Sequence, residues 1–438
     1  MNRSNWRKFV ALGVVLLLGS AVGVLAQEST GNVFAKVKDT GGNPLPGVTC
    51  ELSGMGAPSM QVSNAAGEVR WISLDPGNWS LRCSLEGFST VEYPAISVRV
   101  GRNVSIEVAL AEAIGEVITV TSESPLLDER KIATGTTVTQ VELETIPTAR
   151  DPWAVVSQTP GVLVDRINVG GNESGQQANM RAPGTDSFEN TYLVDGVETT
   201  DMAATGASPS YWDFDQFTEM QFETGGADVT KVAAGVSLNL VTKRGTNEFR
   251  GSARFYRTDD SFFGWQTQDT PVISPPDDKL GPGQAGYIGN TINQVTDYGF
   301  EAGGPVVRDR LWFWGSFGTN DIRNRTSSTS GNPAAIQNDD TILENTAFKF
   351  NWQIMSANSF VGSWNNGDKK KFGRNAGATR PQETTWDQRG PTAIYKFEDT
   401  HVFSSSFFLG GTYGKVDGGF SLVSKACIAN NGCENAPE

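Results

Sequence analysis

The chain has 438 residues, enough for roughly two to four domains, and a formal net charge of −14 at pH 7. This acidic balance argues against nucleic acid as a partner, because the phosphate backbone selects basic proteins. Charged residues make up 19% of the chain and apolar residues 38%, so the composition is that of folded domains and excludes a disordered chain.

The N-terminal segment has the pattern of an export signal. Arg3, Arg7 and Lys8 precede an apolar run at residues 9–18, and small residues up to Ala26 form a cleavage site. The run is too short for a membrane helix, which needs about 20 apolar residues. We therefore expect the first 26 residues to be a signal peptide and the mature chain to be exported.

Residues 29–111 predict a small all-β domain. Short alternating apolar runs are separated by turn clusters such as Gly41-Gly42-Asn43-Pro44 and Asp75-Pro76-Gly77-Asn78. The expected strands are residues 33–37, 48–52, 68–72, 79–85 and 104–110. Several short strands with Gly and Pro turns between them indicate a β-sandwich.

The four cysteines of an exported chain predict disulfides, for which three pairings are possible. Cys50 and Cys83 lie in two expected strands of one small domain, whereas Cys427 and Cys433 lie close together in a polar loop. We therefore expect the bridges Cys50–Cys83 and Cys427–Cys433. Metal binding is the weaker interpretation, because the chain has one histidine and no CxxC pair, and no metal site is predicted.

A stiff segment follows the predicted sandwich. It consists of Glu116, Val117, Ile118, Thr119, Val120 and Thr121, and its last five residues are all β-branched. Such residues favour an extended backbone that can add to the edge of a sheet. Taken alone, these residues are explained equally well by an ordinary strand.

Residues 122–245 predict a mixed α/β region. A short helix is expected at residues 138–146, where Thr139 and Glu142 have the spacing of a capping box, and a second at residues 154–158. Glycine pairs such as Gly225-Gly226 and the Asp195-Gly196 dipeptide indicate turns.

From about Asn247 the chain alternates between strands joined by tight turns and long polar stretches. In the segment 345–355, Phe348, Phe350 and Trp352 fall on one face of a strand, and Lys349 and Asn351 on the other. Further strands are expected at residues 297–304, 311–317, 359–365, 392–397 and 403–413, with tight turns at residues 308–310 and 398–401. Short turns on one side and long loops on the other favour an outer-membrane barrel over a soluble sandwich.

No pattern in the chain predicts an enzyme or a cofactor. The HExxH, GxSxG and GxxxxGK[ST] patterns do not occur, and His401, the one histidine, falls in a predicted turn. The predicted fold class is mainly β, with a β-sandwich, an α+β domain and the first strands of a transmembrane antiparallel β-barrel.

Taken together, the motifs resemble TonB-dependent outer-membrane receptors of the Oar-like subset. Gly47-Val48-Thr49 and Ala66-Gly67-Glu68 within residues 29–111 resemble the carboxypeptidase regulatory-like domain, which is not catalytic. Residues 116–121 look like the TonB box, the strand that the periplasmic TonB protein captures. The motifs that resemble the plug and the start of an Oar-like barrel are residues 179–181, 191–197, 217–226, 235–243, 245–251 and 303–305.

The resemblance implies energised uptake of a glycan, a peptide or a metal chelate across the outer membrane, with sandwich and plug on the periplasmic side. The implied partners are the TonB protein, outer-membrane lipid and an unknown extracellular substrate. The implied domains are the TonB box at 116–121, a plug at 122–245 and the N-terminal part of the barrel at 246–438. A structural or adhesive outer-membrane protein without active transport is the alternative.

The resemblance also implies roles for single residues. The plug motif includes Arg181, Asp195, Gly196, Gly225 and Gly226. Arg181 either helps to hold the plug within the charged barrel wall or is an ordinary surface arginine. Tyr211 and Trp212 either stack on a ligand or pack inside the plug.

One departure from the family pattern concerns strand number. The sequence predicts about seven barrel strands, whereas transporters of this kind have about 22. An open sheet edge in lipid leaves backbone groups unpaired. We therefore expect the chain to be a truncated piece of a longer protein that does not insert or transport by itself.

Overall fold

The computed structural model of the chain is mainly β, as expected from the sequence. It describes residues 30–112, 117–119, 134–146, 148–168, 170–201, 204–208, 210–225, 235–262, 291–326, 337–377, 380–404 and 407–425. The expected signal peptide and the Cys427–Cys433 bridge lie outside these residues. None of the helices in the described residues is both long enough and apolar enough to cross a membrane.

The N-terminal part of the chain forms two sheets that share one hydrophobic core, as in a sandwich. One sheet has the order β4-β1-β7, with β1 at Gly31–Asp39, β4 at Glu68–Leu74 and β7 at Asn103–Leu110. The other has the order β3-β2-β5-β6-β8, with β2 at Thr49–Ser53, β3 at Ser59–Val62, β5 at Gly77–Ser84, β6 at Thr90–Val98 and β8 at Val117–Thr119. Strands β3 and β6 were not predicted, because β3 alternates polar residues with Met and Val and β6 contains Pro94.

Cys50 and Cys83 are joined by a disulfide inside this core. The two residues face each other in the pairing of β2 with β5, and both are fully buried. The bridge closes the chain over a sequence separation of 33 residues.

The next part of the chain forms a five-stranded sheet of order β13-β12-β15-β14-β9, with short helices beside it. We call residues 134–245 the plug. Its strands are β9 (Thr134–Thr139), β10 (Leu163–Val164), β11 (Met180–Arg181), β12 (Thr191–Val194), β13 (Val197–Glu198), β14 (Phe217–Gly225) and β15 (Ser237–Thr242). Its helices are α2 (Gln140–Thr145), α3 (Pro152–Val156), η1 (Ser187–Glu189) and η2 (Phe214–Gln216).

Helix α2 starts where the sequence predicts a capping box. The Glu142 carboxylate accepts hydrogen bonds from the Thr139 backbone N–H at 2.7 Å and from its hydroxyl at 2.8 Å. Helix α3 starts at Pro152, because the carboxylate of Asp151 accepts from the Trp153 N–H and proline suits the first helical position.

The C-terminal part of the chain forms one long antiparallel sheet, which we call the wall. Its strands pair in sequence order from β16 to β22, and β23 pairs with β21. They are β16 (Arg250–Asp259), β17 (Thr291–Val307), β18 (Leu311–Thr326), β19 (Gln337–Met355), β20 (Asn358–Arg374), β21 (Trp386–Ser404), β22 (Phe407–Gly418) and β23 (Ser421–Ser424), with η3 (Asp260–Phe262) and η5 (Gln382–Thr384) between them. Within the described residues the sheet does not close into a barrel.

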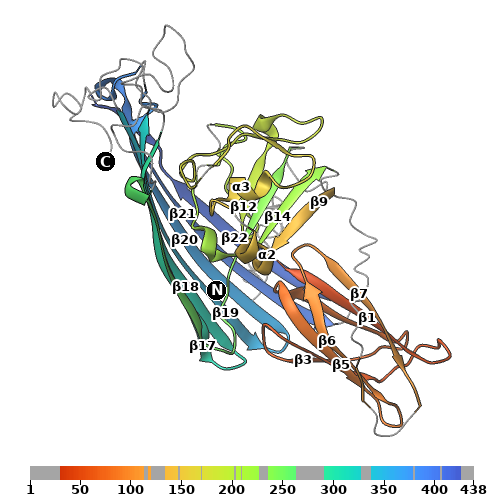
Figure 1. The fold of residues 1–438 in the computed structure, drawn as a ribbon. Coiled ribbons are helices and arrows are strands. Elements are labelled where there is room, and N and C mark those ends of the chain that lie inside the picture. The colour runs from red at the N-terminus through yellow and green to blue at the C-terminus, as the bar shows by residue number, and fades with distance from the viewer. Residues whose placement is uncertain are drawn as a thin grey trace, which may run out of the picture.

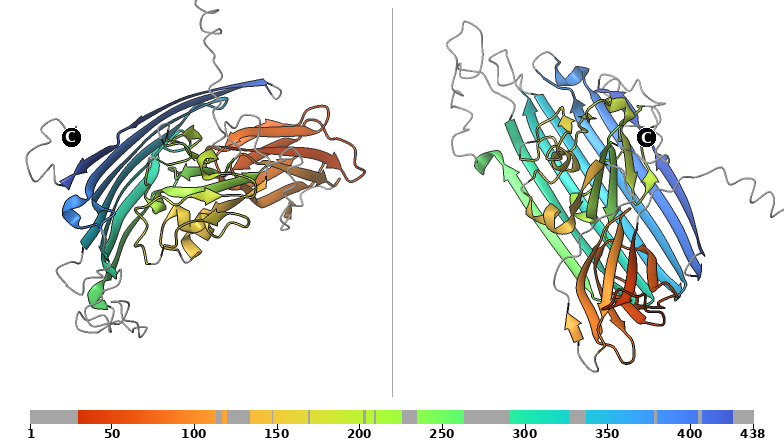
Figure 2. Two further views of the ribbon diagram at one scale, coloured as in Figure 1. Left: turned by 90° about the horizontal axis from the view of Figure 1, so that it is seen from above. Right: turned by 90° about the vertical axis from the view of Figure 1, so that its right-hand side faces the viewer.

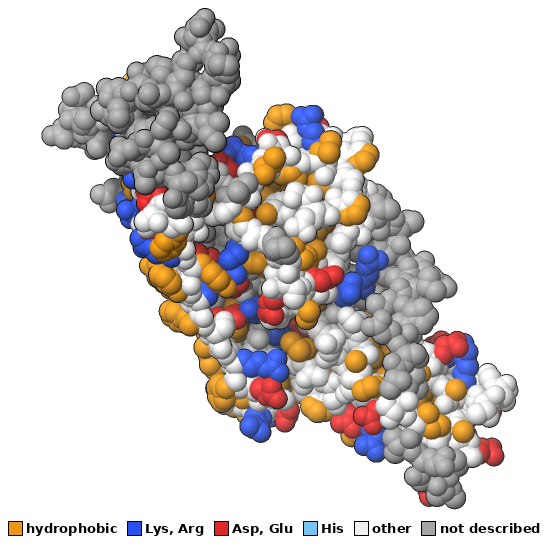
Figure 3. Space-filling view, viewed as in Figure 1, with side chains coloured by type: hydrophobic (Ala, Val, Ile, Leu, Met, Phe, Trp, Pro, Cys, Tyr) orange, Lys and Arg blue, Asp and Glu red, His pale blue; other side chains and the backbone are white. Residues whose placement is uncertain are grey.

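The wall curves around the plug, which lies on its concave side (Figures 1 and 2). The sandwich lies beside the plug, toward one end of the wall strands. In Figure 3, hydrophobic side chains follow the margin of the wall, and charged side chains of both signs lie between wall and plug. The wall therefore presents an apolar outer face and a polar inner face.

Several wall strands are longer than predicted. Residues 398–401, expected to form a turn, lie inside β21, and the predicted polar stretch after Asn365 begins inside β20. The turn prediction was wrong because the polar residues there look like loop residues when only the apolar alternation is considered. Lys369 and Lys371 are buried on the inner face and alternate with the partly exposed Asp368 and Lys370, so the strand continues with polar residues on both faces.

The two faces of β19 are those expected from the sequence. Phe348 and Trp352 are each 45% exposed on the outer face, while Lys349 and Asn351 are buried on the inner face. Outer aromatic rings form a chain of contacts across the strands: Phe348–Phe350, Phe350–Phe360, Phe360–Phe397 and Phe397–Tyr413. An aromatic outer surface and a polar inner surface suit a membrane-spanning sheet with a filled interior.

Replacing both Cys50 and Cys83 with alanine should lower the free energy of unfolding of the sandwich by about 3–4 kcal/mol, because the bridge restricts the unfolded chain. Denaturant unfolding followed by the fluorescence of Trp71 and Trp79 measures this change. The oxidised parent without reductant is the control. An unchanged unfolding midpoint in the double variant would show that the bridge does not stabilise the domain.

Candidate functional site

The contact between plug and wall is centred on the carboxylate of Asp195. Asp195 and Gly196 form the two-residue turn between β12 and β13, with φ of 48° and 78°. Positive φ at both positions is typical of tight hairpin turns, which favour the Asp-Gly pair. The turn places the Asp195 side chain in the interior, where it is 1% exposed and accepts hydrogen bonds from the N–H and the hydroxyl of Thr242.

Two lysines from the wall complete this cluster. The ammonium group of Lys349 lies 3.2 Å from the Asp195 carboxylate and 3.1 Å from the Thr242 hydroxyl. Lys396 on β21 donates to the backbone carbonyl of Asp195 at 2.7 Å. Burial acts to raise the pKa of Asp195, but the charges of Lys349 and Lys396 and the bonds from Thr242 outweigh it, so its pKa lies below the usual value.

A second ionic cluster joins the plug to the first wall strands. Arg254 on β16 reaches Asp213 at 2.6 Å and Asp215 at 3.0 Å in the plug, and Asp297 on β17 at 2.9 Å. Arg150 of the plug contacts Asp215 and lies 3.2 Å from Asp297. Burial acts to raise the pKa of Asp215, but the charges of Arg150 and Arg254 outweigh this effect. The pKa of Asp215 therefore lies below its usual value.

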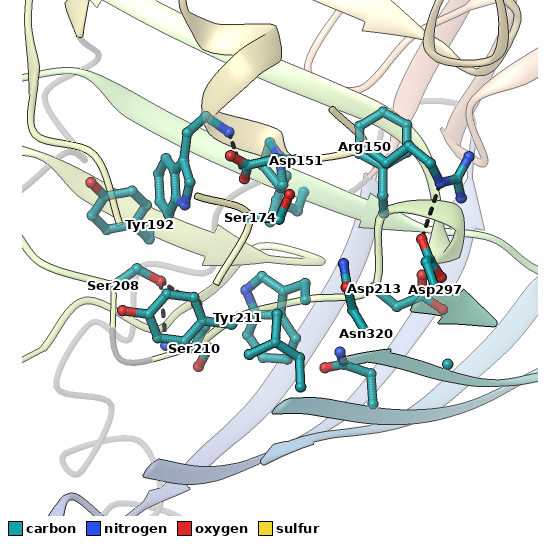
Figure 4. A pocket seen from close by; sticks show the side chains of 18 of the residues that line it. Arg150, Asp151, Ser174, Tyr192, Ser208, Ser210, Tyr211, Asp213, Asp297 and Asn320 are labelled. Atoms are coloured by element: carbon teal, nitrogen blue, oxygen red, sulfur yellow. Dashed lines mark hydrogen bonds and ion pairs between the residues drawn. The ribbon is translucent and has the colours of Figure 1, made fainter. Parts of the chain in front are cut away.

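A small cavity lies next to the second cluster, between plug and wall (Figure 4). Its lining includes Arg150, Ser210, Tyr211, Asp213 and Asn320. Its volume of about 30 Å³ holds roughly two water molecules. The cavity is too small for a substrate, so we interpret it as part of the packing between plug and wall.

The sandwich also binds the plug directly. The Val100 N–H donates to the Glu219 carboxylate at 3.1 Å, and the Gln221 amide donates to the Val100 carbonyl at 3.3 Å. The buried Arg244 forms an ion pair with Asp75 of the sandwich and lies over the Trp312 ring of the wall. Sandwich, plug and wall therefore meet at one junction.

The predicted coupling segment is partly described. Val117–Thr119 form β8, which pairs in parallel with β6 at Thr90, Val91 and Glu92. Ile118 is 41% exposed. Glu116, Val120 and Thr121 lie outside the described residues. The segment thus forms the edge strand of a sandwich sheet, in line with the ordinary-strand interpretation, and it keeps an extended backbone.

Arg181 lies at the surface of the plug, which fits the second of its two interpretations, an ordinary surface arginine. Its side chain is 59% exposed, and its partner is Asp186 of the plug at 3.8 Å. No ion pair between Arg181 and the wall occurs among the described residues. The wall residues that bind the plug include Lys349, Lys396 and Arg254, none of which was predicted as a site residue. The signal was present for Lys349, which lies on the polar face of a predicted strand.

The other predicted plug residues separate into turn and packing positions. Gly225 ends β14 opposite Thr134 of β9, and Gly226 lies outside the described residues. Trp212 is buried in the plug core, as the packing interpretation requires. Tyr211 is half-buried, and the Lys369 ammonium lies 3.7 Å from its ring centroid, so the two aromatic residues have different surroundings.

The buried carboxylate of Asp151 in the plug forms no ion pair with any of the described residues. Asp151 accepts hydrogen bonds from the Trp153 N–H and from the Asn168 amide. Burial is the largest influence and raises the pKa of Asp151 to about 7, against the effect of these bonds. Below about pH 7 the Asp151 carboxyl is therefore mostly protonated in the folded plug.

Lys349→Met should destabilise the plug–wall contact by about 3–5 kcal/mol, because it leaves the buried Asp195 carboxylate without its cation. Adding Asp195→Asn should recover part of the loss. Urea unfolding of the chain in detergent, followed by tryptophan fluorescence, measures both changes. Lys415→Met is the control, because the Lys415–Asp417 pair is exposed and solvent screens it, so its loss should leave the urea midpoint unchanged. Equal losses in Lys349→Met and Lys415→Met would contradict the role of this pair.

Asp151→Asn should make plug stability less dependent on pH. The pKa of Asp151 is raised in the folded state. Its contribution to the free energy of unfolding is therefore fully present below about pH 4 and is lost as the pH rises through about 7. Relative to the parent, the free energy of unfolding of the variant should therefore increase by roughly 4 kcal/mol between pH 4 and pH 8. Urea midpoints of both proteins from pH 4 to pH 8 test this, and parallel curves would rule it out.

Two comparisons by sequence give matches. Residues 32–111 match the carboxypeptidase regulatory-like domain. The chain is 29% identical over 367 residues to the TonB-dependent transporter Oar of Myxococcus xanthus. This match covers 80% of the chain and 32% of that protein, so the chain spans about a third of the length of this relative.

The chain also aligns with solved structures, at lower sequence identity than with the Oar transporter. The outer-membrane transporter YddB of Escherichia coli aligns at 13% identity and a TM-score of 0.47, over 64% of this chain and 38% of that one. The siderophore receptor PirA of Pseudomonas aeruginosa aligns at 13% identity and a TM-score of 0.45, over 67% of this chain and 42% of that one.

The relative matched by sequence is a TonB-dependent transporter, in agreement with the class expected from the sequence. The resemblance to TonB-dependent receptors of the Oar-like subset is confirmed: over 80% of its length the chain is similar to the TonB-dependent transporter Oar, and its residues 32–111 match the carboxypeptidase regulatory-like domain.

Proposed function

We propose that the chain serves TonB-dependent, energised uptake of a bulky substrate across the outer membrane. The substrate is a glycan, a peptide or a metal chelate, and the inner-membrane TonB protein supplies the pull. The proposed domains are the sandwich at 29–111, the TonB box at 116–121, the plug at 122–245 and the wall from residue 246 onward.

The observation that carries this proposal is a separately folded plug held against the inner face of the wall by buried ion pairs. Asp195 with Lys349, and Asp213 with Arg254, join the two across polar surfaces. An apolar interface would leave large hydrophobic surfaces exposed when the plug moves. Paired charges can be rehydrated instead, so a polar contact suits a part that must leave and return.

Strand β9 of the plug sheet is the strand that a pull by the TonB protein would detach first. Among the described residues, strand β9 is the edge of the sheet and pairs with β14, from Thr134 opposite Gly225 to Thr139 opposite Glu219. Residues 120–133 link it to β8. A pull on this link acts on the Thr134 end, so the hydrogen bonds of β9 would break one pair after another.

The position of Gly135 favours such peeling. A Cβ atom at this position would meet the Phe222 carbonyl oxygen at 2.0 Å, so only glycine fits against β14 there. No side chain at residue 135 adds packing to the pairing. The end of β9 nearest to the pull therefore depends mainly on backbone hydrogen bonds.

The coupling strand is accessible for capture. Strand β8 lies at the edge of its sheet, with β6 on one side, and Ile118 is half-exposed. A strand of the TonB domain can add to the other edge of β8 or replace β6. Both routes use backbone hydrogen bonds, as in other cases of strand addition.

Ile118→Pro should weaken binding of a periplasmic TonB domain to the chain by about tenfold or more, because proline removes a backbone donor and disfavours strand pairing. Ile118→Ala keeps the backbone donor and should bind within a fewfold of the parent. Binding of the labelled TonB domain to the detergent-solubilised chain, measured by fluorescence anisotropy, tests this. Binding of all three forms with equal affinity would exclude residues 116–121 as the box, and no binding by any form would favour the adhesive function.

A further inference from the structure

A lysine on the inner face of the wall lies buried without an acidic partner. The side chain of Lys369 on β20 is among the most buried of the wall, at 2% exposed, and its described contact is the ring of Tyr211 in the plug at 3.7 Å. No carboxylate of the described residues forms an ion pair with it. By contrast, the next residues Lys370 and Lys371 are paired with Glu344 and Asp339.

Further positive charge surrounds this position. Lys371, Arg374 and Arg166 all act electrostatically on Lys369, and Arg374 and Arg166 act on the Tyr211 hydroxyl as well. Arg166 is neutralised by Glu173 and Lys371 by Asp339. Arg374 has a buried guanidinium nitrogen, Nη1, with no hydrogen-bond partner. The cluster therefore has two positive groups, on Lys369 and Arg374, that no carboxylate of the described residues balances.

The same inner face of β20 presents a further unused donor. The amide nitrogen of Asn365 is buried and has no hydrogen-bond partner, and Asn365 precedes Lys369 by four residues, so both point inward. Close to them, the backbone of Tyr211 approaches Gly367, where an added Cβ would lie 3.2 Å from the Tyr211 carbonyl oxygen. The plug and β20 thus form a tight contact in which positive charge and unpaired N–H groups are concentrated.

A buried ammonium group is unfavourable without a counter-charge, and its contact with an aromatic ring offsets only part of the loss of water. Arginine adds planar donors that fit carboxylate and phosphate oxygens in pairs. A site of this composition is stabilised when an anion arrives and is indifferent to neutral sugars. Lys370, the next residue on the same strand, shows the opposite arrangement, because its ammonium group is paired with the Glu344 carboxylate.

We propose that Lys369 and Arg374, with Tyr211 beside them, bind an anionic group of the transported substrate, a carboxylate or a phosphate. The inference rests on the proposed uptake function and specifies the substrate class. Binding of the anion would draw Lys369 away from the Tyr211 ring and so loosen a contact between wall and plug. Substrate arrival would then be coupled to the plug through one side chain.

The test uses the detergent-solubilised chain and two probes, citrate and pyrophosphate, titrated by calorimetry. The parent should bind at least one of them, with an affinity that falls as the salt concentration rises. Lys369→Met, which keeps the apolar stem, should bind at least tenfold more weakly. Lys370→Met is the matched control on the outer face of the same strand and should bind within twofold of the parent.

Arg374→Gln provides a second variant that does not touch the Tyr211 contact, and it should also weaken anion binding severalfold. A cooperative unfolding transition with a midpoint no lower than that of the parent shows that each variant is folded. Equal binding by the parent and Lys369→Met, or no binding of either probe by the folded parent, would overturn the proposal. TonB binding, measured on the same proteins, is expected to be unchanged, so loss of anion binding with TonB binding intact separates this inference from the uptake function.

Discussion

The buried carboxylate of Asp195 is the constraint on which the arrangement of plug and wall depends. It closes a tight turn inside the plug, holds the end of β15 through Thr242 and accepts the charge of Lys349 from the wall. One side chain therefore links a local turn, the plug sheet and the plug–wall contact. Since an unpaired charge at this depth is strongly unfavourable, the three parts can separate only if water enters as they do.

The buried ion pair of Asp195 fixes the position of the plug without making the plug–wall contact strongly stabilising. Buried ion pairs add little net stability compared with apolar packing, yet removing one partner alone is costly. The plug is thus held in one position without being bound by a large apolar surface. The hydrophobic core of the plug is almost entirely made of plug residues, with Ile394 as the wall residue that joins it. Detaching the plug would leave its own core largely intact.

The parts predictable from sequence are those with a repeating pattern. The alternation around Phe348 and Lys349 gave the correct faces of β19, and Thr139 with Glu142 marked the start of α2. The ends of the wall strands were missed, because inward polar residues such as Lys369 look like loop residues until the plug that they face is known. The wall partners of the plug depend on contacts between residues far apart in the chain, such as Asp195 and Lys396, 201 positions apart, and no local pattern reveals them.

The pairing of β8 has a consequence for the order in which the molecule yields under tension. Strand β8 is joined to β6 over three residue pairs, whereas β9 is joined to β14 over six. The sandwich itself is anchored to the plug by Val100 and by the Asp75–Arg244 pair. The pairing of β8 with β6 is therefore the shorter of the two, and under the proposed pull on residues 116–121 it would open before the pairing of β9 with β14.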